Sequence, residues 1–161
     1  MINRPRKISF SCLGILAVAF FIYGCDSHRL FEENKTIRDY NWDYNIPVVF
    51  NVDIQDTANA HTMFINVRNA GYYRFSNLFL FVNTVLPQGQ TLRDTVEITL
   101  AEPDGKWMGN GLGDIYDNRY VFRSGFRFPQ KGMYRFELIQ AMRVNPLQGI
   151  MDAGIRIEKT K

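Results

Sequence analysis

The stretch "VVFNVDI", residues 48–54, indicates the fold class of this chain. Apolar residues occupy every second position from Val48 to Ile54, and the two later positions between them hold Asn51 and Asp53. Side chains of an extended strand point alternately to its two faces, so this pattern buries one face and leaves the other in water. A strand with one dry face is typical of antiparallel sheets. We therefore predict an antiparallel β-strand here, with partners elsewhere in the chain.

The same alternation recurs along the chain. Four further segments carry it: residues 62–68, 95–100, 134–140 and 155–159. The stretch "NLFLFVNTV", residues 77–85, is apolar on both sides and predicts a central strand that is either covered on both faces or lies at a contact. Residues 119–128 are rich in aromatics and broken at Ser124-Gly125, which indicates two short strands or one bulged strand. About eight short strands between Gly, Pro and Asn turns, without a helix of ordinary length, predict an all-β fold, an antiparallel β-sandwich.

The N-terminus has the organisation of a secretory signal. Three basic residues among the first seven precede a largely apolar run over residues 8–23, which is shorter than the roughly 20 residues of a membrane span. The small Gly24 then precedes Cys25, an arrangement that resembles a bacterial lipobox, although Tyr23 is a bulky occupant. We predict that residues 1–24 are a lipoprotein signal peptide and that Cys25 is lipidated. An ordinary signal peptide ending at this cysteine is the alternative.

The rest of the chain is predicted to divide into the lipidated cysteine with a tether, residues 25–45, and a β-sandwich domain, residues 46–161. Leu30 and Trp42 are too apolar for a wholly free linker, so part of the tether is expected along the domain surface. Loss of the signal removes three of the 19 Lys and Arg residues, so the remainder equal the 16 Asp and Glu residues. Nucleic-acid binders carry a basic surplus, so we predict no nucleic-acid partner.

No arrangement of residues predicts catalysis or a metal site. His28 and His61 lie far apart, have no partner at metal-ligand spacing, and are expected to be two surface histidines. The chain has no G-x-S-x-G motif, and its cysteine beyond the signal is the one predicted to be acylated, so nucleophilic catalysis finds no support. We predict a protein that is not an enzyme and takes no cofactor.

The stretch "PDGKWMGNGLGDIYDN", residues 103–118, is the strongest candidate for a functional segment. Its glycines do not follow the spacing of a phosphate-binding loop, and its oxygen ligands do not match an EF-hand. Turn capping is expected for its Asp and Asn residues, with Ca²⁺ coordination as the alternative. Loops on a rigid scaffold often carry interaction surfaces, and we predict that this one docks a protein partner. The candidate interaction residues are Asp104, Trp107, Asp114, Tyr116 and Asp117.

Three segments, read with the Cys-Asp-Ser that follows the signal, together resemble one family of bacterial lipoproteins. They are residues 103–118, 128–143 ("FPQKGMYRFELIQAMR") and 147–159 ("LQGIMDAGIRIEK"). Through them the chain is identified as a member of the GldH family of gliding-motility lipoproteins of Bacteroidota. The resemblance implies a non-catalytic protein of the gliding and type IX secretion apparatus. Its implied partners are the membrane, through the lipid on Cys25, and other envelope proteins.

The resemblance also implies a location in the cell envelope, and we expect the outer rather than the inner membrane. Residues 56–58 (Asp-Thr-Ala) and 94–96 (Asp-Thr-Val) resemble the O-glycosylation pattern of that phylum. The alternative function is a lipid-anchored glycan-binding β-sandwich module, in which Trp107, Tyr116 and Tyr120 would stack on sugar rings. Trp107 could equally cap the end of the core.

Overall fold

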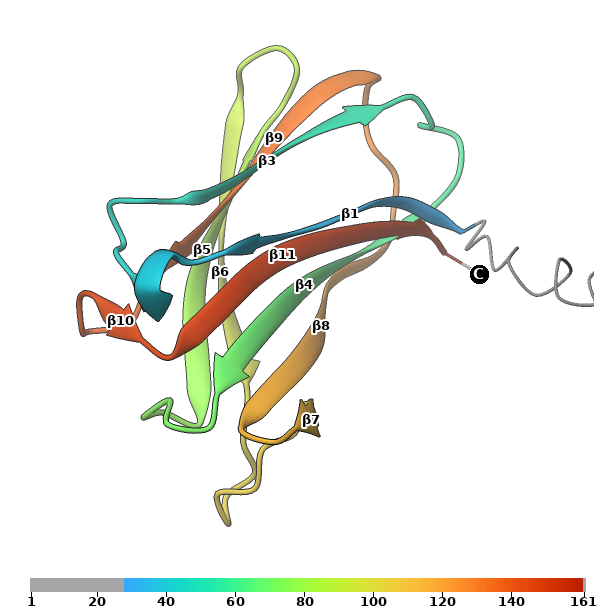
Figure 1. The fold of residues 1–161 in the computed structure, drawn as a ribbon. Coiled ribbons are helices and arrows are strands. Elements are labelled where there is room, and N and C mark those ends of the chain that lie inside the picture. The colour runs from blue at the N-terminus through green and yellow to red at the C-terminus, as the bar shows by residue number, and fades with distance from the viewer. Residues whose placement is uncertain (1–27, 161) are drawn as a thin grey trace, which may run out of the picture.

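The computed structural model describes residues 28–160, so the predicted signal peptide and Cys25 lie outside the described residues. Two antiparallel sheets pack face to face (Figure 1). The prediction of an all-β antiparallel β-sandwich is confirmed. Within the described residues, no helix has the length and apolar character needed to cross a membrane.

The larger sheet has five strands in the order β1-β11-β4-β8-β7. Their bounds are β1 (Arg29–Thr36), β4 (His61–Ala70), β7 (Asn110–Leu112), β8 (Ile115–Phe126) and β11 (Ile150–Lys159). The first and last strands, β1 and β11, lie side by side, as Figure 1 shows in blue and red. The sheet therefore forms only when both ends of the described chain are in place.

The smaller sheet has four strands in the order β3-β9-β5-β6. Their bounds are β3 (Val48–Ile54), β5 (Asn77–Val85), β6 (Thr91–Thr99) and β9 (Gly132–Gln140). A short pair, β2 (Asn41–Trp42) with β10 (Leu147–Gln148), and the 3₁₀ helix η2 (Arg38–Tyr40) lie beside the two sheets.

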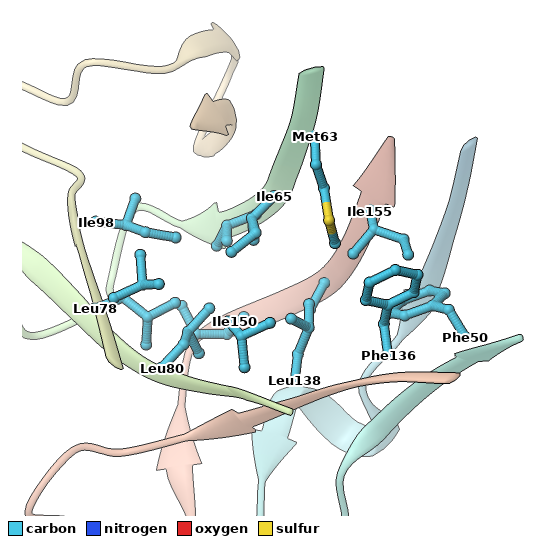
Figure 2. Close-up of a cluster of buried hydrophobic side chains, with 14 of the residues drawn as sticks. Phe50, Met63, Ile65, Leu78, Leu80, Ile98, Phe136, Leu138, Ile150 and Ile155 are labelled. Atoms are coloured by element: carbon cyan, nitrogen blue, oxygen red, sulfur yellow. The ribbon is translucent and has the colours of Figure 1, made fainter. Parts of the chain in front are cut away.

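The core fills the space between the inner faces of the two sheets (Figure 2). Every second residue of each strand points inward, because successive side chains alternate between the faces. Full burial of one such aliphatic or aromatic side chain contributes roughly 1.5–3 kcal/mol. The core residues no more than 2 % exposed include Phe50, Leu80, Phe136 and Leu138 from the smaller sheet and Met63, Ile65 and Ile155 from the larger.

Each of the seven segments predicted as strands corresponds to a strand, although residues 95–100 and 119–128 extend one and two residues beyond β6 and β8. β5 lies between β9 and β6, as expected of a central strand, and its inner residues are buried. Its outer face is half covered: the Arg93 guanidinium lies over the Phe81 ring, 4.7 Å from the ring centroid. The break at Ser124-Gly125 falls inside β8, whose register with β4 shifts around Met63, so the bulged-strand alternative is the one observed.

The domain begins earlier in the chain than the sequence indicates. Residues 29–36, predicted as part of a tether over residues 25–45, form β1 and pair with β11. Trp42, inside the same predicted tether, is 1 % exposed and belongs to the core. The predicted domain boundary at residue 46 is therefore corrected to Arg29.

The larger sheet has two ends that matter for function. At the proximal end, defined by Arg29, His61 and Lys159, β1 begins and β11 ends. At the distal end, defined by Ala70 and Ile115, β4 ends and β8 begins. β4 has ten residues, so at about 3.3 Å per residue the two ends are roughly 30 Å apart. In Figure 1 the C-terminus marks the proximal end, and β7 lies at the distal end.

His61 is not the surface histidine that the sequence predicts. Its side chain is fully buried, and its ring lies 5.3 Å from the Phe128 ring and 6.3 Å from the Phe126 ring, between centroids. Within the described residues neither ring nitrogen has a hydrogen-bond partner. Burial lowers the pKa of His61 from its ordinary value of 6.5, although the negative charge of Asp56 opposes the shift. His61 is therefore a neutral part of the core.

Replacing His61 with leucine is expected to flatten the pH dependence of stability between pH 7 and pH 5. The folded state resists protonation of His61 while the unfolded state accepts it, so the wild-type free energy of unfolding falls as pH drops below about 6.5. Urea unfolding at several pH values measures the slope. His28→Leu, at an exposed histidine, is the matched control and should keep the wild-type slope. If the free energy of unfolding changed equally with pH in His61→Leu and in wild type, the assignment of His61 as a neutral core residue would be wrong.

Candidate functional site

The segment 103–118 is a turn followed by a β-hairpin. The Asp104 carboxylate accepts a hydrogen bond of 3.1 Å from the backbone N–H of Lys106, which is the turn capping expected for it. A bridge between Ala101 and Trp107 closes this turn. The chain then forms β7, which pairs with the start of β8 and adds a fifth strand to the larger sheet. The segment is therefore part of the sheet as well as a loop.

Trp107 and Tyr116 hold this hairpin against the core. Their ring centroids lie 5.5 Å apart, and Trp107 also lies 6.4 Å from the Tyr73 ring. Both side chains are half-buried, and Trp107 packs on the core cluster. Gly109 passes close to β8: a Cβ on it would lie 2.7 Å from the Asp117 carbonyl oxygen. These contacts support the role of Trp107 as a cap on the end of the core.

Four exposed apolar side chains gather at the distal end. We call this surface the apolar end and define it by Tyr72, Met108, Leu112 and Ile115, whose exposed fractions are 63, 57, 90 and 37 %. Leu112 and Ile115 are cross-strand partners at the β7–β8 turn. The Gly71 N–H donates to the Asp114 carbonyl oxygen at 2.7 Å, which joins the end of β4 to the β7–β8 turn. Large apolar side chains left in water at one end of a domain are candidates for an interaction site.

The three predicted aspartates do not converge. Asp104 caps its turn, Asp114 is exposed at the β7–β8 turn, and Asp117 lies on the outer face of the larger sheet. The described residues contain no group of three or more His, Cys, Asp or Glu side chains placed to hold a metal ion. The structure thus brings together Trp107 and Tyr116 and separates the other three predicted residues.

The outer face of the larger sheet carries a hollow that sequence reasoning missed. It has a volume of about 580 Å³, and we call it the polar groove. Side chains from β1, β4, β7, β8 and β11 line it. They include Asn34, Asn66, Arg68, Asp117, Arg119 and Asp152. Pockets of roughly 300–1,000 Å³ are of the size that small-molecule ligands occupy.

Glu32 is the centre of one half of the groove. Its carboxylate accepts hydrogen bonds from Arg156 at 2.7 Å, from Arg29 at 3.1 Å and from Arg119 at 3.1 Å. Burial alone would raise the pKa of Glu32. The hydrogen bonds from Arg156 and Arg29, with the charges of Arg156 and Arg119, hold that pKa below its ordinary value. Glu32 is thus ionised and holds arginines that come from three strands.

Asn66 extends this network across β4. Its amide donates to the Asn34 side-chain oxygen at 3.1 Å, and its own oxygen accepts from Arg119 at 3.2 Å. The Arg119 guanidinium also lies over the Phe64 ring, 5.9 Å from the centroid. These contacts fix the orientation of side chains that would otherwise move freely in water.

The other half of the groove is organised around Asp152. This carboxylate, on a residue 6 % exposed, accepts hydrogen bonds from Thr36 at 2.7 Å and from the Arg68 Nε at 2.6 Å. A terminal nitrogen of Arg68 contacts the same carboxylate oxygen, Oδ2, while Thr36 donates to Oδ1. Hydrogen bonds between two charged groups are stronger than neutral ones.

The sequence did not predict the groove because its residues have the pattern of any strand with one solvent-exposed face. Asn66 and Arg68 alternate with the buried residues of β4, which is the pattern of any half-exposed strand. The available signal was the density of Asn and Arg at these outward positions, together with Gly154 on the neighbouring strand. That signal becomes visible only when β1, β11, β4 and β8 are placed side by side.

Replacing Glu32 with glutamine is expected to lower the free energy of unfolding by about 1–2 kcal/mol, because charge-assisted hydrogen bonds to arginines are lost. Urea unfolding at pH 7 measures the loss. The wild-type advantage should disappear as the pH falls well below 4.5, since Glu32 itself then becomes neutral. Glu33→Gln is the matched control, because Glu33 pairs only with Lys35 on exposed surface and should cost less than about 0.5 kcal/mol. Equal losses in the two variants would contradict the role of Glu32.

The sequence model of the family described as GldH lipoprotein matches residues 29–157. The chain is 34 % identical over 161 residues to a protein of Christiangramia forsetii named gliding motility lipoprotein GldH homolog, covering 96 % of this chain and 98 % of the relative. It is 36 % identical over 152 residues to the gliding motility lipoprotein GldH of Flavobacterium johnsoniae, covering 90 % of this chain and 94 % of that protein.

Proposed function

Because the chain belongs to the GldH lipoprotein family, we propose that it is a gliding-motility lipoprotein that holds partner proteins in the cell envelope and catalyses no reaction. The observation that carries this proposal is the apolar end, where Leu112 is 90 % exposed. Exposed apolar side chains at the distal end, beside a hairpin that the Trp107–Tyr116 contact helps to hold, favour a protein–protein contact over exposure to water.

The short distance between Cys25 and the domain supports the same proposal. His28 is three positions after Cys25, so a lipid on Cys25 would keep the proximal end within about 11 Å of the membrane surface. The apolar end would then lie roughly 30 Å farther out, directed away from the lipid. This placement presents the apolar end to other envelope proteins. In our proposal these are components of the gliding and type IX secretion machinery, and the lipid lies in the outer membrane.

Lipidation is tested by Cys25→Ala. We expect labelled fatty acid to disappear from the protein and the protein to leave the membrane fraction. Separation of inner and outer membranes from cells carrying the wild-type protein then identifies the membrane. Retention of the fatty-acid label in the variant would contradict the assignment of Cys25.

The docking role is tested by Leu112→Lys, which places a charge in the centre of the apolar end. We expect envelope proteins that co-purify with the wild type from detergent-solubilised membranes to be lost, together with spreading on agar and secretion of type IX substrates. Met133→Lys is the matched control, because Met133 is 55 % exposed but lies on β9 in the other sheet. Wild-type behaviour of Leu112→Lys, at equal protein level, would overturn the proposal.

A further inference from the structure

We propose that the polar groove binds a short neutral oligosaccharide. The groove lies on the outer face of the larger sheet, whereas the proposed protein contact lies on the hairpin at its distal end. The two sites adjoin on the β7–β8 hairpin, where Asn110 and Asp117 line the groove and Leu112 and Ile115 form part of the apolar end. Because different side chains form them, substitutions can test each site without the other.

The shape of the groove suits a short chain-like ligand. Its lining comes from five adjacent strands, which at about 4.8 Å between strands span roughly 19 Å. The ligand would lie across the strands, on a face where the backbone groups already bond to neighbouring strands. Recognition must therefore come from side chains, and addition of a peptide strand, which needs a free sheet edge, is not available there.

The charges of the groove favour a neutral ligand. Asp152 is paired with Arg68, and Glu32 is paired with Arg119 and with Arg156 beneath the groove. An anion would approach Asp117 and Asp152, and a cation would approach Arg68 and Arg119, so each meets charge of its own sign. Polar atoms make up the larger share of the groove lining, which favours a polar ligand over an acyl chain.

Several hydrogen-bonding groups remain available after this pairing. Among the described residues, the Asp117 carboxylate and the Asn110 amide, cross-strand partners on β8 and β7, have no side-chain partner. Arg68 uses Nε and one terminal nitrogen on Asp152, which leaves its other terminal nitrogen. The groove thus offers acceptors and donors on Asp117 and Asn110, beside an Arg68 guanidinium that Asp152 holds in place.

A sugar hydroxyl matches this arrangement because it donates one hydrogen bond and accepts others. A hydroxyl that donates to the Asp117 carboxylate can accept from Arg68, which lies directly opposite Asp117 in the β4–β8 register. An adjacent hydroxyl of the same ring can repeat this pattern with Asn110. A neutral polyhydroxyl chain is the ligand class that uses both kinds of group without bringing a charge.

The test uses the full-length lipoprotein, purified from membranes in a detergent without a sugar headgroup. Maltotriose, cellotriose, mannotriose and chitotriose are the neutral probes, and a uronic-acid trisaccharide is the acidic one. We expect calorimetric titration to detect binding of at least one neutral trisaccharide. Asp117→Ala should weaken that binding at least tenfold, and Asn110→Ala should weaken it severalfold. Circular dichroism confirms that each variant is folded, which is expected because both side chains are exposed.

Two controls keep the result specific to the groove. Asp53→Ala removes the same charge from an exposed position on β3, in the other sheet, and should leave the affinity unchanged. Leu112→Lys should also bind the trisaccharide as the wild type does, which separates this proposal from the docking role of the apolar end. Absence of binding to all four neutral probes, binding of the acidic probe alone, or full affinity in Asp117→Ala would each overturn the proposal.

Discussion

Replacing Trp42 with alanine is expected to lower the free energy of unfolding by about 3–5 kcal/mol. The indole is 1 % exposed and packs in the core cluster, so its removal leaves a cavity that the surrounding strands cannot fill. A domain of this size has a total stability of roughly 5–15 kcal/mol, so the variant should be close to unfolding at growth temperature. Urea unfolding followed by circular dichroism measures the change.

Tyr44→Ala is the matched control for Trp42→Ala. Tyr44 lies two residues away, and its side chain is 48 % exposed, so its loss should cost no more than about 0.5 kcal/mol. The comparison decides whether the chain before residue 46 is a tether or part of the fold. If Trp42→Ala were as stable as Tyr44→Ala, the sequence-based boundary would stand and the structural one would be wrong.

Replacing Gly154 with alanine is expected to cost about 2–3 kcal/mol, because the added methyl group has no room. A Cβ on Gly154 would lie 2.6 Å from the Glu33 carbonyl oxygen and would overlap the side chain of Asn34. The Asn34 side chain can rotate away from the added methyl group. The Glu33 carbonyl belongs to the paired strands β1 and β11, so it can move only if these strands separate. The variant should therefore weaken the pairing of β1 and distort the floor of the polar groove.

Thermal or urea unfolding measures the effect, with Gly71→Ala as control. A Cβ on Gly71 would meet its nearest atoms at 3.5 Å, an ordinary contact, so this variant should be nearly neutral. Adding Asn34→Ala to Gly154→Ala separates the two sources of crowding. We expect only partial recovery of stability, since the Glu33 carbonyl remains. Complete recovery would mean that the conflict lies with the Asn34 side chain alone.

Most strands of the sandwich could be predicted because the residue pattern that identifies each strand lies within a few neighbouring positions. In β3 and β9 the buried and exposed residues alternate within a few positions, and no knowledge of the partner strand is needed. β1 could not be predicted in this way. Its inward positions include Glu33 and Lys35, and Lys35 reaches over the Phe50 ring to bond the Val49 carbonyl oxygen at 2.6 Å. An edge strand with polar residues on both faces has the composition of a linker.

The candidate site likewise has one part that the sequence could predict and one part that it could not. The segment 103–118 stands out in the sequence because its glycines and aromatics are unusual, and the structure gives those residues local roles in a capped turn and a hairpin. The polar groove depends on the order β1-β11-β4-β8-β7, which brings together residues more than 100 positions apart, such as Thr36 and Asp152. The residue pattern of a single segment contains no information about the order of the strands in the sheet.

The pairing of β1 also determines how the domain would respond to force. With a lipid on Cys25 and a partner on the apolar end, tension would run along the strands from the distal end to the start of β1. β1 would then be pulled along its length against β11. The hydrogen bonds between the two strands, from Arg29 to Thr36, would all bear the load at once, whereas a pull across the strands would break them one after another. Under the proposed function, a short connection to the lipid and an edge strand loaded in shear would help the domain stay folded when force acts between its anchor and its partner.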